Sequence, residues 1–299
     1  MTEAEFLAAL RTLPLHPGAH GLLDDTAALD GLILTTDTIV EGIHYLPGDP
    51  PEDVAWKLLA ANLSDLAAKG AAPEGALLNY PLAPSPSGWD EAFLAGLGGV
   101  LDRFACPLLG GDTVSLPADA PRVITLTAIG RASDAPTRDG AQAGDALYVT
   151  GTIGDAGAGL RIARGAPGPG TLLTAYRRPQ PRLAEGRALA PIVHAMMDVS
   201  DGVLIDAARM AEASGLAVTV DLAAIPLSDA YRAFAGDDRA ARLAAATSGD
   251  DYELLFAAPA DAALPVAATR IGAFSTGDGL TLHDHGAPVP LPPVLGFQH

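Results

Sequence analysis

The chain has 299 residues, a length that suits one large or two ordinary domains with a sizeable core. Its 18 basic and 36 acidic residues give a net charge of −18, which disfavours nucleic acid and anionic membranes as partners. The single Cys106 excludes an internal disulfide, the acidic start is not typical of a signal peptide, and no apolar run approaches about 18 residues. We therefore expect a globular, cytoplasmic protein.

The amino-terminal part of the chain predicts alternating helices and strands. In chain order they are a helix at 3–13, a strand at 32–36, a helix from about 52 to 69, a strand at 76–80, a helix at 89–103, and strands near 107–109 and at 122–130. The helix at 52–69 has prolines at its start and Gly70 at its end. The turn-rich passage 131–145 follows, and we expect a domain boundary within it, giving domains 1–137 and 138–299.

The remainder of the chain continues the alternation. It predicts a strand at 146–150, helices near 155–164, 171–177 and 181–190, a strand over AMMDV, a helix at 202–214, and strands in AVTVDL, YELLF and TRIGAF. This order of elements is typical of an α/β or α+β protein in two halves.

Seven aspartates stand in short phrases rich in Gly, Ser and Thr. They are Asp24 and Asp25 in LLDD, Asp37 in TTDT, Asp65 in NLSD, Asp112 in GGDT, and Asp198 and Asp201 in DVSD. Carboxylates beside small residues are typical ligands of hard divalent cations. If the seven converge, their charge requires several Mg²⁺ ions, and Mg²⁺ usually binds together with phosphates. The pattern therefore favours chemistry on a polyphosphate.

Each phrase has a structural setting that agrees with this interpretation. Asn62 and Asp65 lie on or beside the apolar face of the helix at 52–69, where a buried polar pair needs a reason. Asp37 follows a strand together with Thr35 and Thr36, and strand ends are where α/β proteins bind ligands. Taken alone, Asp65 is more often a solvated aspartate near a helix end, and Asp37 is as often an aspartate turn or cap.

Two further phrases combine metal ligands with anion donors. Gly110 and Gly111 allow backbone amides to approach a phosphate, while Asp112 beside them offers a carboxylate. DVSDGV stands at a strand-to-helix transition, where Ser200 lies between two aspartates and a helix amino terminus attracts anions. Taken alone, GGDT is a weak signal, because Gly-Asp turns are common.

Several familiar motifs are absent or incomplete. No GxxxxGK[ST] segment and no kinase-type HRD or DFG set is present, and the histidines show no zinc spacing. GTIGDAGAG at 151–159 imitates a dinucleotide fingerprint, but no acidic residue follows about 20 residues later, so we do not expect a dinucleotide site.

Taken together, six phrases closely resemble the thiamine-monophosphate kinase family, within the superfamily of aminoimidazole ribonucleotide synthetase and selenophosphate synthetase. They are TTDTIVEGIHY, AANLSDLAAKGA, GGDT, TRDGAQAGDALYVTG, MMDVSDGV and SGDDYELLF, in this order, and the resemblance covers about 21–297. It implies direct transfer of the ATP γ-phosphate to thiamine monophosphate, several Mg²⁺ ions, and a homodimer that pairs through the amino-terminal sheet in a barrel-like interface. It leaves a requirement for K⁺ open.

The resemblance also assigns roles by position. The implied metal ligands are Asp25, Thr35, Thr36, Asp37, Asp65, Asp112, Asp198 and Asp201, to which the LLDD phrase adds Asp24 as a candidate, and we expect Asp37, Asp65, Asp112 and Asp198 to act directly in catalysis. The implied ATP site contains Gly110, Gly111, Asp112, Arg138 and Ser200. The implied substrate site contains His44, Asp250 and Phe297.

The chain departs from the family pattern at two of these places. Leu23 replaces the second glycine of GxGDD, and Asp250 replaces a glutamate before DYEL. Three alternatives therefore stay open: another ATP-dependent synthetase of the superfamily, a non-catalytic Mg-nucleotide-binding relative, and a metal-dependent phosphohydrolase.

Overall fold

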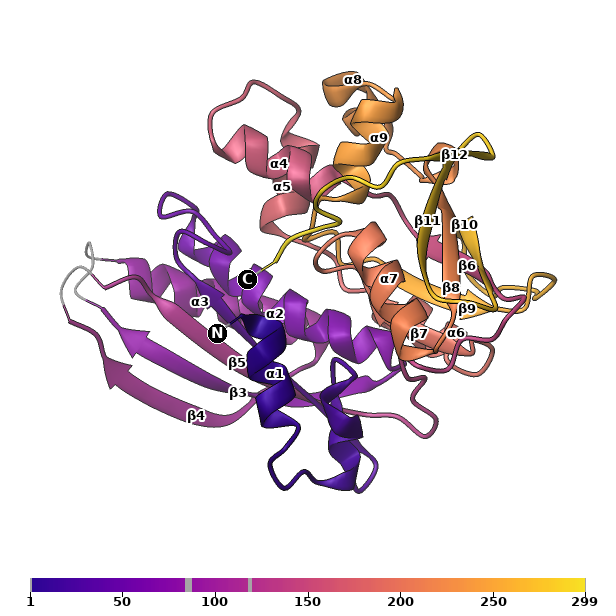
Figure 1. Cartoon of the computed structure of the whole chain (residues 1–299). Coiled ribbons are helices and arrows are strands. Elements are labelled where there is room, and N and C mark those ends of the chain that lie inside the picture. Colours follow the sequence, from indigo (N-terminus) through magenta and orange to yellow (C-terminus); the bar gives the residue numbers. More distant parts are fainter. Residues whose placement is uncertain (1, 84–87, 118–119, 299) are drawn as a thin grey trace.

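The computed structural model describes residues 2–83, 88–117 and 120–298 and shows two halves, each built around one β-sheet (Figure 1). The amino-terminal half contains α1 (Glu3–Leu10), the 3₁₀ helix η1 (Pro17–Leu22), β1 (Ala27–Leu29), β2 (Leu32–Val40), α2 (Pro51–Ala68), β3 (Ala72–Leu82), α3 (Trp89–Phe104), β4 (Leu108–Ser115) and β5 (Val123–Arg131).

The carboxyl-terminal half contains more and shorter elements. They are β6 (Ala146–Thr150), α4 (Asp155–Ala163), α5 (Gly170–Arg177), α6 (Leu183–Leu189), β7 (Ala195–Asp198), α7 (Val203–Ala213), β8 (Ala217–Asp221), the 3₁₀ helix η2 (Leu222–Ala224), α8 (Asp229–Ala235), α9 (Arg239–Ala246), β9 (Leu254–Ala258), β10 (Ala268–Ser275), β11 (Gly279–Asp284) and β12 (Ala287–Val289). The predicted mixed fold in two halves is confirmed.

The first sheet has the strand order β1-β2-β5-β3-β4, and only its β3–β4 pair is parallel. Its strands alternate: Ile124, Leu126 and Ala128 of β5 are buried, whereas Val123 at the start of the strand is exposed. The buried side faces α2, which contacts both β2 and β5. Every residue of the edge strand β4 is exposed. The sheet is open in a single chain, so the expected barrel-like pairing of two chains stays a prediction.

The second sheet has the order β12-β11-β8-β10-β6-β9-β7, with β8–β11 as its parallel pair. Both β6 and β9 are buried along their whole length, as expected for central strands. Helix α7 packs on this sheet, and α2 of the other half packs against β7.

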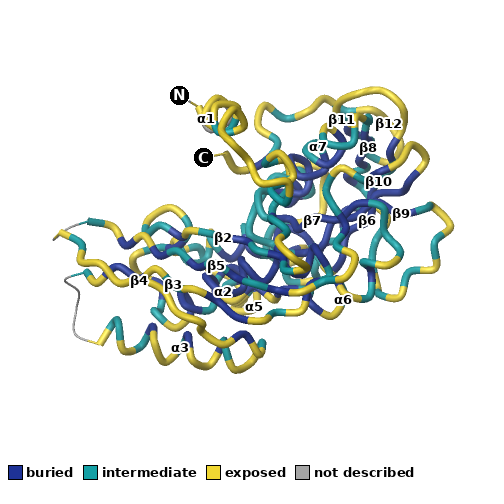
Figure 2. The backbone as a smooth tube through the Cα atoms, turned by 90° about the horizontal axis from the view of Figure 1, so that it is seen from below, coloured by how far each residue is buried: buried dark blue, intermediate teal, exposed yellow. Residues whose placement is uncertain are grey.

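Helix α2 joins the two halves into one core. Fifteen of its eighteen residues are buried, so it is surrounded by protein rather than amphipathic. One hydrophobic cluster runs from Leu58 and Leu66 of α2 to Met196 and Phe256 of the second sheet, and Figure 2 shows this buried centre. A Cβ at Gly186 of α6 would lie 1.9 Å from the Ala67 carbonyl oxygen, so α6 can approach α2 only with glycine there.

Two differences from the sequence expectations concern the local structure. The strand expected near 107–109 extends through the GGDT phrase as β4, which pairs in parallel with β3. Helices α8 and α9 and strands β11 and β12 were not predicted individually. The chain after β12 crosses back towards the first half (Figure 1), and the Phe297 N–H donates to the Asp201 carbonyl oxygen at 2.9 Å.

In the described part of the chain, every helix is too short or too polar to cross a bilayer.

Candidate active site

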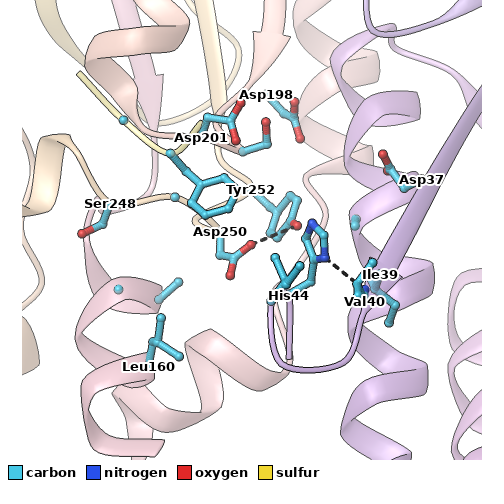
Figure 3. A pocket seen from close by; sticks show the side chains of 18 of the residues that line it. Asp37, Ile39, Val40, His44, Leu160, Asp198, Asp201, Ser248, Asp250 and Tyr252 are labelled. Atoms are coloured by element: carbon cyan, nitrogen blue, oxygen red, sulfur yellow. Dashed lines mark hydrogen bonds between the residues drawn. The ribbon is translucent and has the colours of Figure 1, made fainter. Parts of the chain in front are cut away.

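A cavity of about 990 Å³ lies between the two halves. Six carboxylates line it: Asp25, Asp37 and Asp65 from the first half, and Asp198, Asp201 and Asp250 from the second. Five of the seven predicted aspartates therefore line one cavity. The sixth carboxylate, Asp250, was predicted as a substrate-site residue. Figure 3 shows Asp37 on the β2 side of this cavity and Asp198 and Asp201 opposite it.

Asp25, Asp65 and Asp198 form the closest group. Each offers a carboxylate oxygen, and these oxygens lie within 4.8 Å of one another, close to the span of ligands around one divalent cation. They come from the turn before β1, the last turn of α2 and the end of β7. The Asp25 Oδ2 atom is buried and has no hydrogen-bond partner among the described residues, which suits a carboxylate that binds a cation.

The electrostatics of this group also favour a cation. Burial, followed by repulsion from Asp37, holds the pKa of Asp65 well above its usual value, and burial followed by repulsion from Asp25 does the same for the pKa of Asp198. Burial, with repulsion from Asp25 and Asp201, raises the pKa of Asp37 to about 6. In the absence of a cation, the cluster is therefore held together against its own repulsion.

The alternation of β2 separates the two threonines of TTDT. The Thr35 hydroxyl is buried and donates to Asp65 Oδ2 at 2.5 Å. Thr36 points to the opposite face of the sheet, where its hydroxyl accepts from the Thr127 hydroxyl at 3.0 Å. The Thr36 side chain therefore does not face the side of the strand that carries Asp37.

Two ion pairs lie beside the carboxylate group. Asp24 Oδ1 accepts from Lys69 Nζ at 2.5 Å, and Lys69 is 1% exposed, so this is a buried ion pair rather than part of the cluster. The Arg138 guanidinium donates to Asp25 Oδ1. Leu23 has a φ of −109°, a value open to any residue, so replacing the family glycine adds no backbone strain at this position.

The DVSDGV segment is held by a residue that the sequence alone did not single out. Asp206 of α7 is fully buried, and its Oδ2 accepts the backbone N–H groups of Asp201 and Gly202, both at 3.2 Å. Arg209 donates to Asp206 Oδ1 at 2.9 Å and to Asp201 Oδ2 at 2.5 Å. Burial raises the pKa of Asp206 to about 7, although Arg209 opposes the shift.

The cavity also contains the three predicted substrate residues, His44, Asp250 and Phe297. Figure 3 shows Asp250 beside Tyr252, whose hydroxyl donates to Asp250 Oδ1 at 3.2 Å. Lys57 of α2 donates to Asp250 Oδ2 at 2.7 Å. Neither Lys57 nor Tyr252 was predicted as a site residue, because a lysine within a helix and a tyrosine before a strand carry no specific signal.

The GGDT residues lie outside this cavity. Gly111, Leu78, Leu126 and Asp37 are successive partners across the first sheet, so Gly111 and Asp37 are three strand spacings apart, roughly 14 Å. Within one chain, Asp112 beside Gly111 cannot share a cation with Asp37. Gly110, Gly111 and Asp112 all lie on the exposed edge strand β4.

The phrase that imitates a dinucleotide fingerprint has a clear structural explanation. The backbone N–H groups of Gly154 and Ala156, at the amino terminus of α4, donate to the Asp251 carboxylate at 2.8 and 3.3 Å. A protein carboxylate therefore occupies the position where a phosphate would bind a helix terminus. This contact also ties α4 to the segment that carries Asp250.

The sequence matches two family descriptions in succession: "AIR synthase related protein, N-terminal domain" over residues 23–132, and "AIR synthase related protein, C-terminal domain" over residues 142–282. A thiamine-monophosphate kinase from Caulobacter vibrioides is 40% identical over 95% of this chain and 86% of that protein. One from Escherichia coli is 37% identical over 93% of this chain and 91% of that protein.

Solved structures agree with these matches. The structure named AaThiL complexed with AMPPCP and TMP has a TM-score of 0.89 at 28% identity and covers 100% of this chain and 97% of that chain. Thiamine-monophosphate kinase from Stenotrophomonas maltophilia has a TM-score of 0.77 at 36% identity over 95% of this chain and 96% of that chain. The chain therefore belongs to the AIR synthase related proteins and, among them, to the thiamine-monophosphate kinases.

Proposed function

We propose that the chain transfers the γ-phosphate of ATP directly to the phosphate of thiamine monophosphate and so forms thiamine diphosphate. The convergence of carboxylates from both halves in one cavity carries this proposal. Relatives named for this reaction, and a neighbour complexed with AMPPCP and TMP, support it.

The buried carboxylates fit Mg²⁺ as the resident cation. Asp25, Asp65 and Asp198 would hold one ion, and Asp37, Asp201, the Thr35 hydroxyl and the Thr36 carbonyl lie on adjoining segments that would hold others. Bound Mg²⁺ supplies positive charge that offsets the repulsion between two phosphate groups. The buried Asp25 oxygen without a hydrogen-bond partner supports this assignment, as do the raised pKa values of Asp65 and Asp198.

The proposed acceptor residues and the carboxylate cluster are separated along α2. Lys57, Ala61 and Asp65 are spaced by four residues on one face of α2, so the acceptor end and the carboxylate cluster are roughly 12 Å apart along the helix. The ring end of thiamine monophosphate would contact His44 and Asp250, while its phosphate would lie near Asp65. In this proposal the donor and acceptor phosphates would lie in line, which is the main requirement of phosphoryl transfer.

No protein base is needed in this mechanism. A phosphate monoester has a second pKa of about 6 and is mostly a dianion at neutral pH, so the acceptor is already a nucleophile. Arg138 and Ser200 would contact the nucleotide phosphates. The buried Arg138 Nε has no hydrogen-bond acceptor among the described residues, so this donor remains available for a phosphate oxygen.

We further propose a homodimer in which Asp112 acts in the cavity of the partner copy. Within its own chain, Asp112 lies on an exposed edge strand remote from the carboxylate cluster. The same strand exposes Leu108, Leu109 and Val114, and a long apolar edge of this kind is normally covered by another chain. Pairing through this sheet would bring the GGDT phrase of each copy to an interface.

Mixing two inactive variants tests this arrangement. Asp65→Asn and Asp112→Asn, each inactive alone, are expected to recover about a quarter of the wild-type activity after subunit exchange, because half of the random dimers then contain one intact site. Differently tagged subunits would establish that mixed dimers form. Mixed dimers without recovered activity would show that Asp112 does not act across the interface.

A product assay tests the proposed function itself. With ATP, Mg²⁺ and thiamine monophosphate, we expect thiamine diphosphate and ADP in equal amounts. ADP release without any acceptor would indicate a phosphohydrolase instead, and nucleotide binding without product would indicate a non-catalytic relative.

The domains 1–137 and 138–299 are likewise proposed as the units that contribute the two walls of the cavity.

A further inference from the structure

A buried lysine at the acceptor end of the cavity has no role in the mechanism above. Lys57 is 2% exposed, and its ammonium group donates to Asp250 Oδ2 at 2.7 Å and to the His44 carbonyl oxygen at 2.9 Å. It also lies 4.2 Å from the centroid of the Tyr176 ring. A buried ammonium group requires such partners, and two of the three belong to residues that line the cavity.

These contacts connect the two halves. Lys57 and His44 belong to the first half, whereas Asp250 belongs to the segment between α9 and β9 of the second. Asp250 and Tyr252 both have positive φ values, 69° and 51°, which residues other than glycine adopt only when the surrounding contacts hold them. With Tyr252 on one carboxylate oxygen and Lys57 on the other, Asp250 is fixed from both sides.

We propose that Lys57 is a positioning residue that determines acceptor specificity through Asp250, and this inference rests on the proposed function. Its ammonium group orients the Asp250 carboxylate and cancels its charge. Beside Asp250, the cavity then favours an acceptor whose ring is uncharged and carries hydrogen-bonding groups. It disfavours an acceptor with a charged group at this position. The shorter side chain of Asp250, relative to the family glutamate, is held in place by the same contact.

The position of Lys57 predicts which kinetic quantity it affects. Lys57 lies two turns of α2 away from Asp65, roughly 12 Å along the helix axis, so it is remote from the phosphoryl group in transfer. Its loss should weaken acceptor binding and leave nucleotide binding unchanged. A residue that only stabilises the fold would lower the melting temperature without distinguishing the two substrates.

The test is a double-mutant cycle on the full chain. Lys57→Met and Asp250→Asn are each expected to raise the KM for thiamine monophosphate at least about tenfold, with the KM for ATP changed less than about twofold. The KM of the double variant for thiamine monophosphate should be no higher than that of the single variant with the higher KM, because Lys57 acts through Asp250. Three outcomes would each overturn the proposal. They are a KM increase in the double variant equal to the product of the single increases, equal increases in the KM values for both substrates, and no change in KM.

Two controls keep the outcome clear. Arg178→Met breaks the ion pair between Arg178 and Asp53 of α2, which joins the same halves outside the cavity, and should leave both KM values unchanged. If Lys57→Met does not fold, two other variants are compared with the wild type. They are Lys57→Gln and the double variant, which leaves no unpaired buried charge.

Calorimetric binding of thiamine monophosphate separates this proposal from the proposed function. Wild-type binding that is at least about tenfold weaker in Lys57→Met supports the role of Lys57 even if no diphosphate forms. Equal binding by both proteins overturns it even if the reaction is confirmed. A wild-type protein that does not bind this acceptor overturns both.

Discussion

Replacement of Asp65 by asparagine is expected to lower the turnover number for phosphoryl transfer by about 10³-fold or more, with the fold retained. Asp65 belongs to the closest carboxylate group and accepts the hydroxyl hydrogen bond of Thr35. Asparagine has the same shape and can keep that hydrogen bond, but it removes the charge that a cation requires. Steady-state production of thiamine diphosphate measures the effect.

The same variant should be at least as stable as the wild type when no metal is present. Burial and the neighbouring carboxylates disfavour the Asp65 charge, so its removal relieves repulsion in the folded state. Glu74→Gln, a change of the same kind in a surface ion pair with Arg131, is the matched control and should leave turnover unchanged. Turnover like that of the wild type in Asp65→Asn would refute the shared metal site.

The second large effect concerns the pH dependence of stability without metal. Burial, with repulsion from Asp25 and Asp201, raises the pKa of Asp37 to about 6 in the folded chain. The folded state therefore holds this proton more tightly than the unfolded state. The contribution of Asp37 is most favourable below about pH 4 and is lost as the pH rises through about 6, a change of roughly 2–3 kcal/mol.

Urea unfolding of the wild type and of Asp37→Asn, from pH 4.5 to 7.5 with EDTA, measures this contribution. The wild type should lose stability relative to the variant as the pH rises, and this comparison removes the effect of the overall net charge of −18. Saturating Mg²⁺ with nucleotide should abolish the relative loss, because a cation favours the ionised carboxylate. Parallel curves for the two proteins under both conditions would contradict the prediction.

Much of the site could be predicted because its residues stand where the local sequence is unusual. Asn62 and Asp65 interrupt an apolar helix face, and both are buried in α2. Asp198 follows an apolar strand and precedes a helix, and it lies at the end of β7 beside the cavity. In these cases the local pattern and the tertiary structure agree, so the sequence alone was sufficient.

The remaining features depend on contacts that are distant in sequence. Two adjacent glycines favour a turn locally, but pairing with β3 places the GGDT phrase in a strand. The sequence does not show that Lys69 pairs with Asp24, or that Lys57 reaches Asp250 across 193 positions. Lysine side chains are rarely buried, so burial of both lysines could be seen only in the folded chain.

Diffraction at the manganese absorption edge, from crystals grown with Mn²⁺ and a non-hydrolysable ATP analogue, tests the central claim most directly. We expect an anomalous peak within coordination distance, about 2.1 Å for an ion that resembles Mg²⁺, of oxygens from Asp25, Asp65 and Asp198. A bound nucleotide with no peak between these three side chains would contradict the account.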